Sequence, residues 1–332
     1  MRRFAELPGI IDELAARHEQ LAVVLLDAFG WAFVQRHADH PLLQRLRIEP
    51  MRSQFPSTTT AHLTTLYSGL PVEEHGLYEW RCYEPLAGAV IRPLRFAPAY
   101  EGYPNLRITP RQLLPWPSVF EQRPATVFQP QEIAETPYGS AALAGARVVG
   151  FRGIEDGVRK LRETPGLSYL YWDRIDAAGH QHGPSSDEFV QASQRALDAL
   201  APIDTPLLVT ADHGQIDVGV TDDLDLLWPQ LREHLTEVPA GSARDLFLHV
   251  RDPETVVREL AARLQDRATV HRAADLFPDA GPRLRERLAD VCVLPAPGRM
   301  AALRAFPSPE RDFKGHHGGL TPAEIETWIG MM

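Results

Sequence analysis

Short apolar runs alternate with amphipathic segments along this chain. The runs that have the length and composition of buried strands lie at 21–26, 125–129, 146–151, 168–172, 206–210 and 245–250. Helical periodicity or helix-start residues predict helices at 9–20, 31–47 with a break at His40-Pro41, 59–67, 153–163, 186–200 and 253–266. Strands that alternate with helices predict an α/β fold with a mostly parallel central sheet and helices on both faces.

Two stretches do not follow this alternation. Residues 81–118 are rich in prolines and aromatic side chains, and residues 219–300 mix strand and helix signals. We expect both to form a cap or insertions over the edge of the sheet. Because no internal repeat or low-complexity tract divides the sequence, residues 1–332 are predicted to form one large α/β domain.

Composition and charge narrow the classes of function. The 332 residues are 44% hydrophobic and 23% charged, as in a globular protein with an apolar core. The formal net charge of −10 disfavours nucleic-acid polymers and anionic membranes as partners, whereas a small anionic molecule could still enter a pocket that is locally positive. The two cysteines, Cys82 and Cys292, suit a reducing compartment, and the charged residues 1–20 do not have the pattern of a secretory signal. The expected location is the cytoplasm.

Acidic and histidine residues follow three of the predicted strands. In chain order they are Asp27, Asp176, His180, Asp212 and His213. The carboxyl ends of parallel strands meet at one edge of a sheet, so these side chains are expected to converge. Mixed carboxylate and imidazole ligands suit Zn²⁺ or Mn²⁺. Taken one at a time, such residues also serve as helix caps or as ion pairs on a solvated helix.

Two further segments carry candidate functional groups. FPSTTT at 55–60 places consecutive hydroxyl residues at a helix start, where they serve as caps or place an alcohol in a position that attracts an anion. A threonine hydroxyl becomes a nucleophile when a base or metal lowers its pKa, and the residues alone do not distinguish Thr58 from Thr59. The glycine-rich segment at 315–320 adds His316 and His317 as metal ligands or as surface residues.

The order of these motifs resembles the alkaline phosphatase superfamily, and most closely its type I phosphodiesterase and nucleotide pyrophosphatase branch. The matching segments, spread over residues 21–322, are Asp27 after its strand, FPSTTT…SGLPVEEHG, DAAGHQHGP, TADHG and HHGGL. The resemblance implies two divalent metal ions, Zn²⁺ or else Mn²⁺, beside a nucleophilic threonine, Thr59. It implies that one ion is held by Asp27, Thr59, Asp212 and His213, and the other by Asp176, His180 and His317. Supporting or structural roles are left for Asp173, His182 and His316.

The same resemblance implies hydrolysis of a small phosphate ester or nucleotide by double displacement. Thr59 attacks phosphorus to form a phosphothreonine, which water then cleaves. Phosphodiesterases of the family carry a phosphate-binding Asn where this chain has Glu79 and Trp80, so these two are candidate substrate-binding residues. A phosphomonoesterase of the same superfamily is the near alternative, and a non-catalytic phosphate-binding protein is the alternative from a different class.

Overall fold

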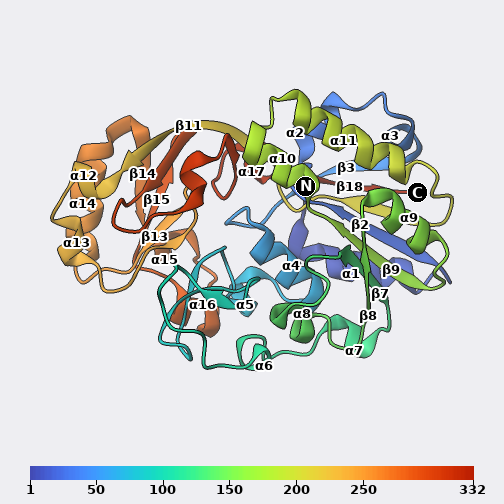
Figure 1. The fold of residues 1–332 in the computed structure, drawn as a ribbon, viewed down its shortest axis with the longest axis horizontal. Coiled ribbons are helices and arrows are strands. Elements are labelled where there is room, and N and C mark those ends of the chain that lie inside the picture. The colour runs from blue at the N-terminus through green and yellow to red at the C-terminus, as the bar shows by residue number, and fades with distance from the viewer.

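An eight-stranded sheet runs through the larger lobe of the protein, in a computed structural model that describes residues 1–332 (Figure 1). Its strands, in spatial order, are β1 (Arg2–Arg3), β3 (Arg47–Arg52), β18 (Glu326–Met331), β10 (Leu207–Thr210), β2 (Leu21–Leu26), β9 (Leu167–Trp172), β7 (Thr126–Pro130) and β8 (Arg147–Phe151). β18 is antiparallel to both of its neighbours, and all other neighbouring strands are parallel. The predicted α/β class with a mostly parallel sheet is therefore confirmed.

Strand β2 shows why the sheet is covered on both faces. All six of its residues are buried, and successive side chains point to opposite faces. Leu21, Val23 and Leu25 belong to one core, which contains residues of α1 (Leu7–Ala15), α4 (Thr59–Ser68), α7 (Val119–Gln122) and α8 (Pro137–Ala142). Ala22, Val24 and Leu26 belong to the other, with residues of α2 (Trp31–Arg36), α3 (Pro41–Arg45), α9 (Ile154–Arg162) and α11 (Asp187–Leu200).

A second lobe, at the left of Figure 1, is built mainly from the segment at 219–300. Its antiparallel sheet has the order β12 (Ala240–Gly241), β13 (Leu246–Leu248), β15 (Val291–Pro295) and β14 (Ala268–Arg272). Helix α14 (Pro253–Leu264) packs on it over a separate apolar core. A three-stranded sheet leads back toward the larger lobe through β16 (Gly298–Ala302), β11 (Ile216–Asp223) and β17 (Gly315–His316).

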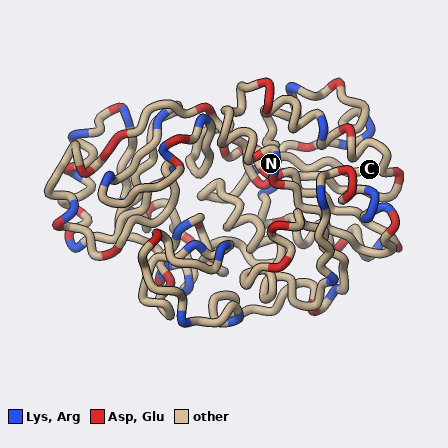
Figure 2. The backbone as a smooth tube through the Cα atoms, viewed as in Figure 1, with Lys and Arg blue, Asp and Glu red and all other residues tan.

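The segment at 81–118 forms a small antiparallel sheet of β4 (Cys82–Glu84), β5 (Ala89–Arg92) and β6 (Ala97–Pro98). The remaining helices are short: α5 (Val72–His75), α6 (Pro110–Leu113), α10 (Arg174–His182), α12 (Leu224–Leu227), α13 (Leu231–His234), α15 (Ala273–Leu276), α16 (Pro282–Arg287), α17 (Pro322–Ile325) and the 3₁₀ turns η1 (Phe4–Glu6), η2 (Gln265–Arg267) and η3 (Pro309–Asp312). None of the helices combines the length and apolar character needed to cross a bilayer. Basic and acidic residues are interspersed around both lobes in Figure 2.

Several elements differ from the sequence-based expectation. The helix predicted at 9–20 ends at Ala15, because the chain must turn before β2 begins at Leu21. The strand predicted at 245–250 is three residues long, 246–248. Strands β3 and β18 were not predicted, because half of the residues of β3 are charged and it contains Pro50, and both strands lack the continuous apolar character of a central parallel strand.

Strand β18 contributes Trp328 to the core, which allows a test of its place in the sheet. Trp328 is fully buried, and its indole N–H donates to the carbonyl oxygen of Phe29 at 2.8 Å. Trp328→Ala is expected to lower the free energy of unfolding by about 3–5 kcal/mol, measured by urea denaturation followed by circular dichroism. Val190→Ala, at a side chain that is 44% exposed, serves as the control with an expected change within about 0.5 kcal/mol.

Candidate metal centre

The carboxyl ends of β10, β2 and β9 carry the acidic residues of the candidate site. These three strands are parallel neighbours, with β2 in the middle. Asp27 directly follows β2, and Asp212 follows β10 after a single alanine. Helix α10 begins shortly after β9 and carries Asp176 and His180, which lie one turn apart on the same face. The order of the strands therefore brings these side chains to one edge of the sheet.

Asp27, Asp212 and His213 form the first of two clusters. Their ligand atoms lie within 4.8 Å of one another, and all three residues are at most 2% exposed. His213 Nε2 is 3.4 Å from Asp27 Oδ1 and 3.3 Å from Asp212 Oδ2. Asp212 Oδ1 accepts hydrogen bonds from the backbone N–H groups of Ala28 and His213, at 3.1 and 3.0 Å. The carboxylate is thus fixed by one oxygen, which leaves the other oxygen free to face the cluster.

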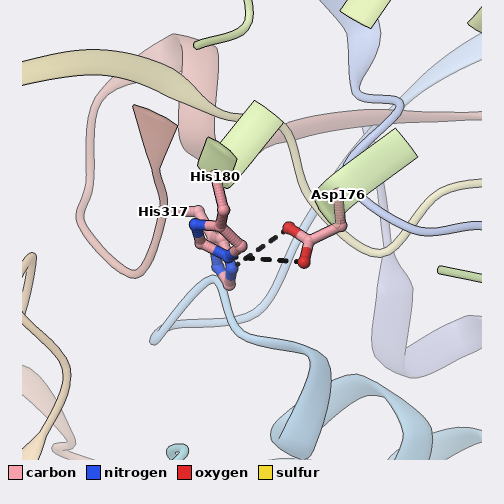
Figure 3. Close-up of side chains that lie close together, drawn as sticks. All are labelled: Asp176, His180 and His317. Atoms are coloured by element: carbon pink, nitrogen blue, oxygen red, sulfur yellow. Dashed lines mark ion pairs between the residues drawn. The ribbon is translucent and has the colours of Figure 1, made fainter. Parts of the chain in front are cut away.

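Asp176, His180 and His317 form the second cluster (Figure 3). His180 Nε2 lies 3.3 Å from Asp176 Oδ2, and His317 Nε2 lies 3.5 Å from Asp176 Oδ1. Figure 3 shows both imidazoles directed at the one carboxylate, although His317 comes from a loop far along the chain from α10. The rings of His213 and His317 stack at 3.8 Å between centroids, so the two clusters adjoin.

The three histidines of the clusters share one hydrogen-bond pattern. In each, Nδ1 faces a backbone carbonyl oxygen: Gly214 for His213 at 3.1 Å, Gly315 for His180 at 2.9 Å, and Ser57 for His317 at 2.7 Å. A carbonyl accepts only, so each Nδ1 carries a proton, and in the neutral ring Nε2 keeps its lone pair. This is the arrangement in which protein imidazoles ligate metal ions through Nε2.

Thr59, the first residue of α4, reaches the first cluster. Its hydroxyl oxygen lies 3.3 Å from both carboxylate oxygens of Asp27 and 3.3 Å from His213 Nε2. The neighbouring Thr58 is the N-cap residue of α4 and is 3% exposed, and its hydroxyl contacts Glu79 instead. The two adjacent hydroxyls therefore point to different surroundings.

Ser57 ties the start of α4 to the loop that carries His317. Its carbonyl oxygen accepts from His317 Nδ1, and its hydroxyl donates to the carbonyl oxygen of Gly319 at 3.0 Å. The same hydroxyl accepts from the N–H of Gly318 at 3.1 Å. The loop and the helix start are consequently joined by several short contacts only two residues from Thr59.

Buried charge dominates the electrostatics of the site. Burial, and then the charges of Asp212 and Asp176, raise the pKa of Asp27 well above its ordinary value. Burial raises the pKa of Asp212 to about 7 as well. For Asp176 burial acts in the same direction, but His180 and His317 outweigh it and lower the pKa to about 2. The first cluster thus gathers more negative charge than its own groups neutralise.

The donor set of both clusters fits divalent cations. Asp212 Oδ2 is buried and has no hydrogen-bond partner, a costly state for a carboxylate oxygen unless a cation faces it. Carboxylate and neutral imidazole ligands in clusters of this size are the combination that Zn²⁺ and Mn²⁺ accept. A dication beside Asp27 and Asp212 would also neutralise their mutual repulsion.

Glu79 and Trp80 lie in different surroundings. Glu79 is fully buried, its Oε1 has no partner, and burial raises the pKa of its carboxyl to about 8, against the hydrogen bond from the backbone N–H of Trp80. Trp80 is half-buried, and the guanidinium of Arg95 lies 6.0 Å from its ring centre. Of the two, only Trp80 presents part of its side chain to solvent.

The supporting candidates and two further residues contact the clusters unequally. His182 is exposed at the end of α10, Asp173 is half-buried with an unpartnered Oδ1, and His316 is buried against the second cluster. Sequence reasoning missed Tyr171, whose hydroxyl donates to Asp27 Oδ2, and Gln215, whose amide donates to the backbone oxygen of Asp176 at 3.2 Å. Their closeness in sequence to the predicted ligands could have identified both, since each lies within five residues of one.

Solved structures share this fold over most of their length. The phosphonoacetate hydrolase of Sinorhizobium meliloti 1021, in complex with phosphonoformate, has a TM-score of 0.68 and 19% identity over 95% of this chain and 90% of that one. Murine ectonucleotide pyrophosphatase/phosphodiesterase 5, as an inactive variant with AMP, has a TM-score of 0.63 and 16% identity over 94% and 87%. The human protein gives 0.62 and 16% over the same shares. The fold is therefore that of the alkaline phosphatase-like hydrolases.

A sequence model of the type I phosphodiesterase/nucleotide pyrophosphatase family matches residues 21–320. The chain belongs to this family and is a phosphoric ester hydrolase, as the motifs indicated. Members of the family typically depend on divalent metal ions. No curated protein sequence matches this chain.

The raised pKa of Asp212 predicts how the stability of chelator-treated protein depends on pH. Its folded value of about 7 exceeds its ordinary 3.8, so the folded state binds a proton more tightly than the unfolded state. The stabilisation is complete below the ordinary value and is lost as pH rises toward 7. The urea midpoint is expected to fall between pH 5 and pH 8, and less steeply in Asp212→Asn. An unchanged slope in Asp212→Asn, with Asp204→Asn at an exposed carboxyl as the control, contradicts this prediction.

Proposed function

We propose that this protein is a metal-dependent phosphodiesterase or nucleotide pyrophosphatase in which Thr59 attacks phosphorus. The observation that carries the proposal is the placement of the Thr59 hydroxyl, 3.3 Å from Asp27 and from His213 Nε2. A group bound at the first cluster would therefore lie beside this hydroxyl. The second cluster adjoins the first through the stacked rings of His213 and His317.

The proposal assigns two ions, Zn²⁺ with Mn²⁺ as the second candidate. One is held by Asp27, Thr59, Asp212 and His213, and the other by Asp176, His180 and His317. Bound dications supply the positive charge that lowers the pKa of an alcohol or a water and stabilises the oxygens around phosphorus. The three Nδ1 contacts to carbonyl oxygens support this assignment, because they leave each Nε2 available as a ligand.

The chain itself positions the reacting groups. The N–H groups of the first turn of α4 and the helix dipole favour an anion beside Thr59, and Asp27 accepts the hydrogen bond that orients its hydroxyl. In the first step the Thr59 oxygen bonds to phosphorus while the bond to the leaving alcohol or phosphate breaks. In the second step a water oxygen replaces Thr59 on phosphorus and the threonine hydroxyl is restored. The phosphothreonine formed in between divides one displacement into two.

The substrate assigned to the site is a small phosphate ester, with nucleotide diesters first. The murine ectonucleotide pyrophosphatase/phosphodiesterase 5 structure contains AMP, and the phosphonoacetate hydrolase structure contains phosphonoformate. A phosphomonoesterase is the second candidate, favoured by Glu79 and Trp80 at the positions where diesterases of the family carry their phosphate-binding Asn. Trp80 is the residue of this pair that a substrate can touch, since Glu79 is buried.

Replacing the nucleophile tests the mechanism. Thr59→Ala is expected to reduce kcat with p-nitrophenyl thymidine monophosphate by at least about 10³-fold, because it removes the hydroxyl that is proposed to attack phosphorus. Thr58→Ala is the matched control and is expected to keep kcat within about tenfold, since its hydroxyl contacts Glu79. Full activity in Thr59→Ala, measured with equal zinc content, rules out the proposed role.

The choice between diester and monoester is decided by a pair of substrates. With Zn²⁺ and again with Mn²⁺, kcat/KM for p-nitrophenyl thymidine monophosphate is expected to exceed that for p-nitrophenyl phosphate. The reverse order, retained in both metals, assigns the protein to the phosphomonoesterases of the superfamily. Thr59→Ala measured in parallel identifies any hydrolysis that comes from a contaminating enzyme.

A further inference from the structure

A buried chain of polar side chains runs from Arg81 through Glu310 to His316, next to the second cluster. Arg81 Nη1 lies 2.6 Å from Glu310 Oε1, and Glu310 Oε2 lies 3.5 Å from His316 Nε2. Glu310 Oε2 also accepts from the N–H of Ala243 at 2.8 Å. Arg81, Glu310 and His316 are 4%, 6% and 3% exposed, so water does not weaken these interactions. None of the three is among the residues assigned to the ions.

The protonation of His316 is fixed by its neighbours. His316 Nδ1 accepts the backbone N–H of His317 at 2.8 Å, so Nδ1 carries no proton. The proton of the neutral ring therefore resides on Nε2, the nitrogen that faces Glu310. The negative charge of Glu310, 3.5 Å from that nitrogen, favours the tautomer that can hold the peptide of His317.

The held peptide belongs to a predicted metal ligand. His317 is fixed by its backbone N–H to His316 and by its Nδ1 to the carbonyl oxygen of Ser57, and its Nε2 faces Asp176. The ring of His316 also meets that of His180 edge to face, with centroids 5.1 Å apart and an interplanar angle of 89°. A shift of His316 would consequently displace two of the three groups of the second cluster.

Arg81 supplies the charge that lets Glu310 remain ionised. Burial alone acts to raise the pKa of Glu310, but the guanidinium of Arg81 outweighs it, and the pKa lies well below the ordinary value. A carboxylate at this depth without that partner would carry a desolvation penalty of several kcal/mol. The ion pair also joins the residue before β4 to η3, two segments far apart in the sequence.

We propose that Glu310 is a positioning residue for the ion held by Asp176, His180 and His317, and that it acts through His316. The proposal rests on the proposed function in one respect, namely that the second cluster binds a metal ion. It assigns no direct contact between Glu310 and the ion or the substrate. Outer groups that orient metal-binding imidazoles generally change metal affinity without being ligands themselves.

The test is zinc binding by Glu310→Gln. Competition with a chromophoric chelator is expected to show one of the two zinc equivalents bound about 10- to 100-fold more weakly than in the unmutated protein, with the other unchanged. The matched control is Glu84→Gln, because Glu84 Oε2 pairs with Arg287 at 2.6 Å and both residues are buried in the same way. Both variants are expected to lose thermal stability, and only Glu310→Gln is expected to lose zinc affinity.

His316 gives a second test that does not disturb the ion pair. His316→Ala removes the acceptor for the N–H of His317 and is expected to weaken the same zinc equivalent. His316→Asn offers a side-chain oxygen near the position of Nδ1 and is expected to restore most of the affinity. The positioning role is overturned if Glu310→Gln binds zinc as tightly as Glu84→Gln does. It is also overturned if His316→Asn binds zinc as weakly as His316→Ala does. Fewer than two zinc equivalents in the unmutated protein overturn the metal assignment itself.

Discussion

Negative charge buried at the carboxyl edge of the sheet is the constraint on which the site depends. Asp27 and Asp212 follow neighbouring parallel strands, and burial together with the charge of nearby carboxylates raises their pKa values. The fold alone does not compensate them, since one oxygen of Asp212 has no partner. A site of this kind is stable in its charged form only when a cation completes it. The strand order of the sheet therefore brings these buried carboxylates together and, by doing so, creates the need for a bound cation.

The sequence predicted those parts of the fold and the site that rest on local pattern. The strands ending before Asp27 and Asp212 are short apolar runs, and Asp176 and His180 share a helix face, so their convergence follows from strand order alone. The fold class and the family were predicted correctly on that basis.

What the sequence did not predict depends on contacts between distant segments. Strand β3, with its charges and Pro50, is a strand because β18 pairs with it along its whole length. Glu310 and Arg81 are separated by more than two hundred residues, and neither lies in a recognisable motif. Only the folded chain shows that this pair reaches the loop of His317. The residues alone left Thr58 and Thr59 open and the family resemblance favoured Thr59, and in the folded chain it is the Thr59 hydroxyl that lies beside Asp27.

The hydrogen bonds between Ser57 and the loop of His317 have a consequence for how the substrate range can change. Because Ser57 binds the loop of His317 on one side and leads directly into α4 on the other, the proposed nucleophile Thr59 and the proposed ligand His317 belong to one connected segment. We therefore expect adaptation to a new leaving group to come from outside this segment, for example from the half-buried Trp80. Natural variants of this fold can then change at such peripheral positions while Thr59 and the residues of the two clusters stay the same.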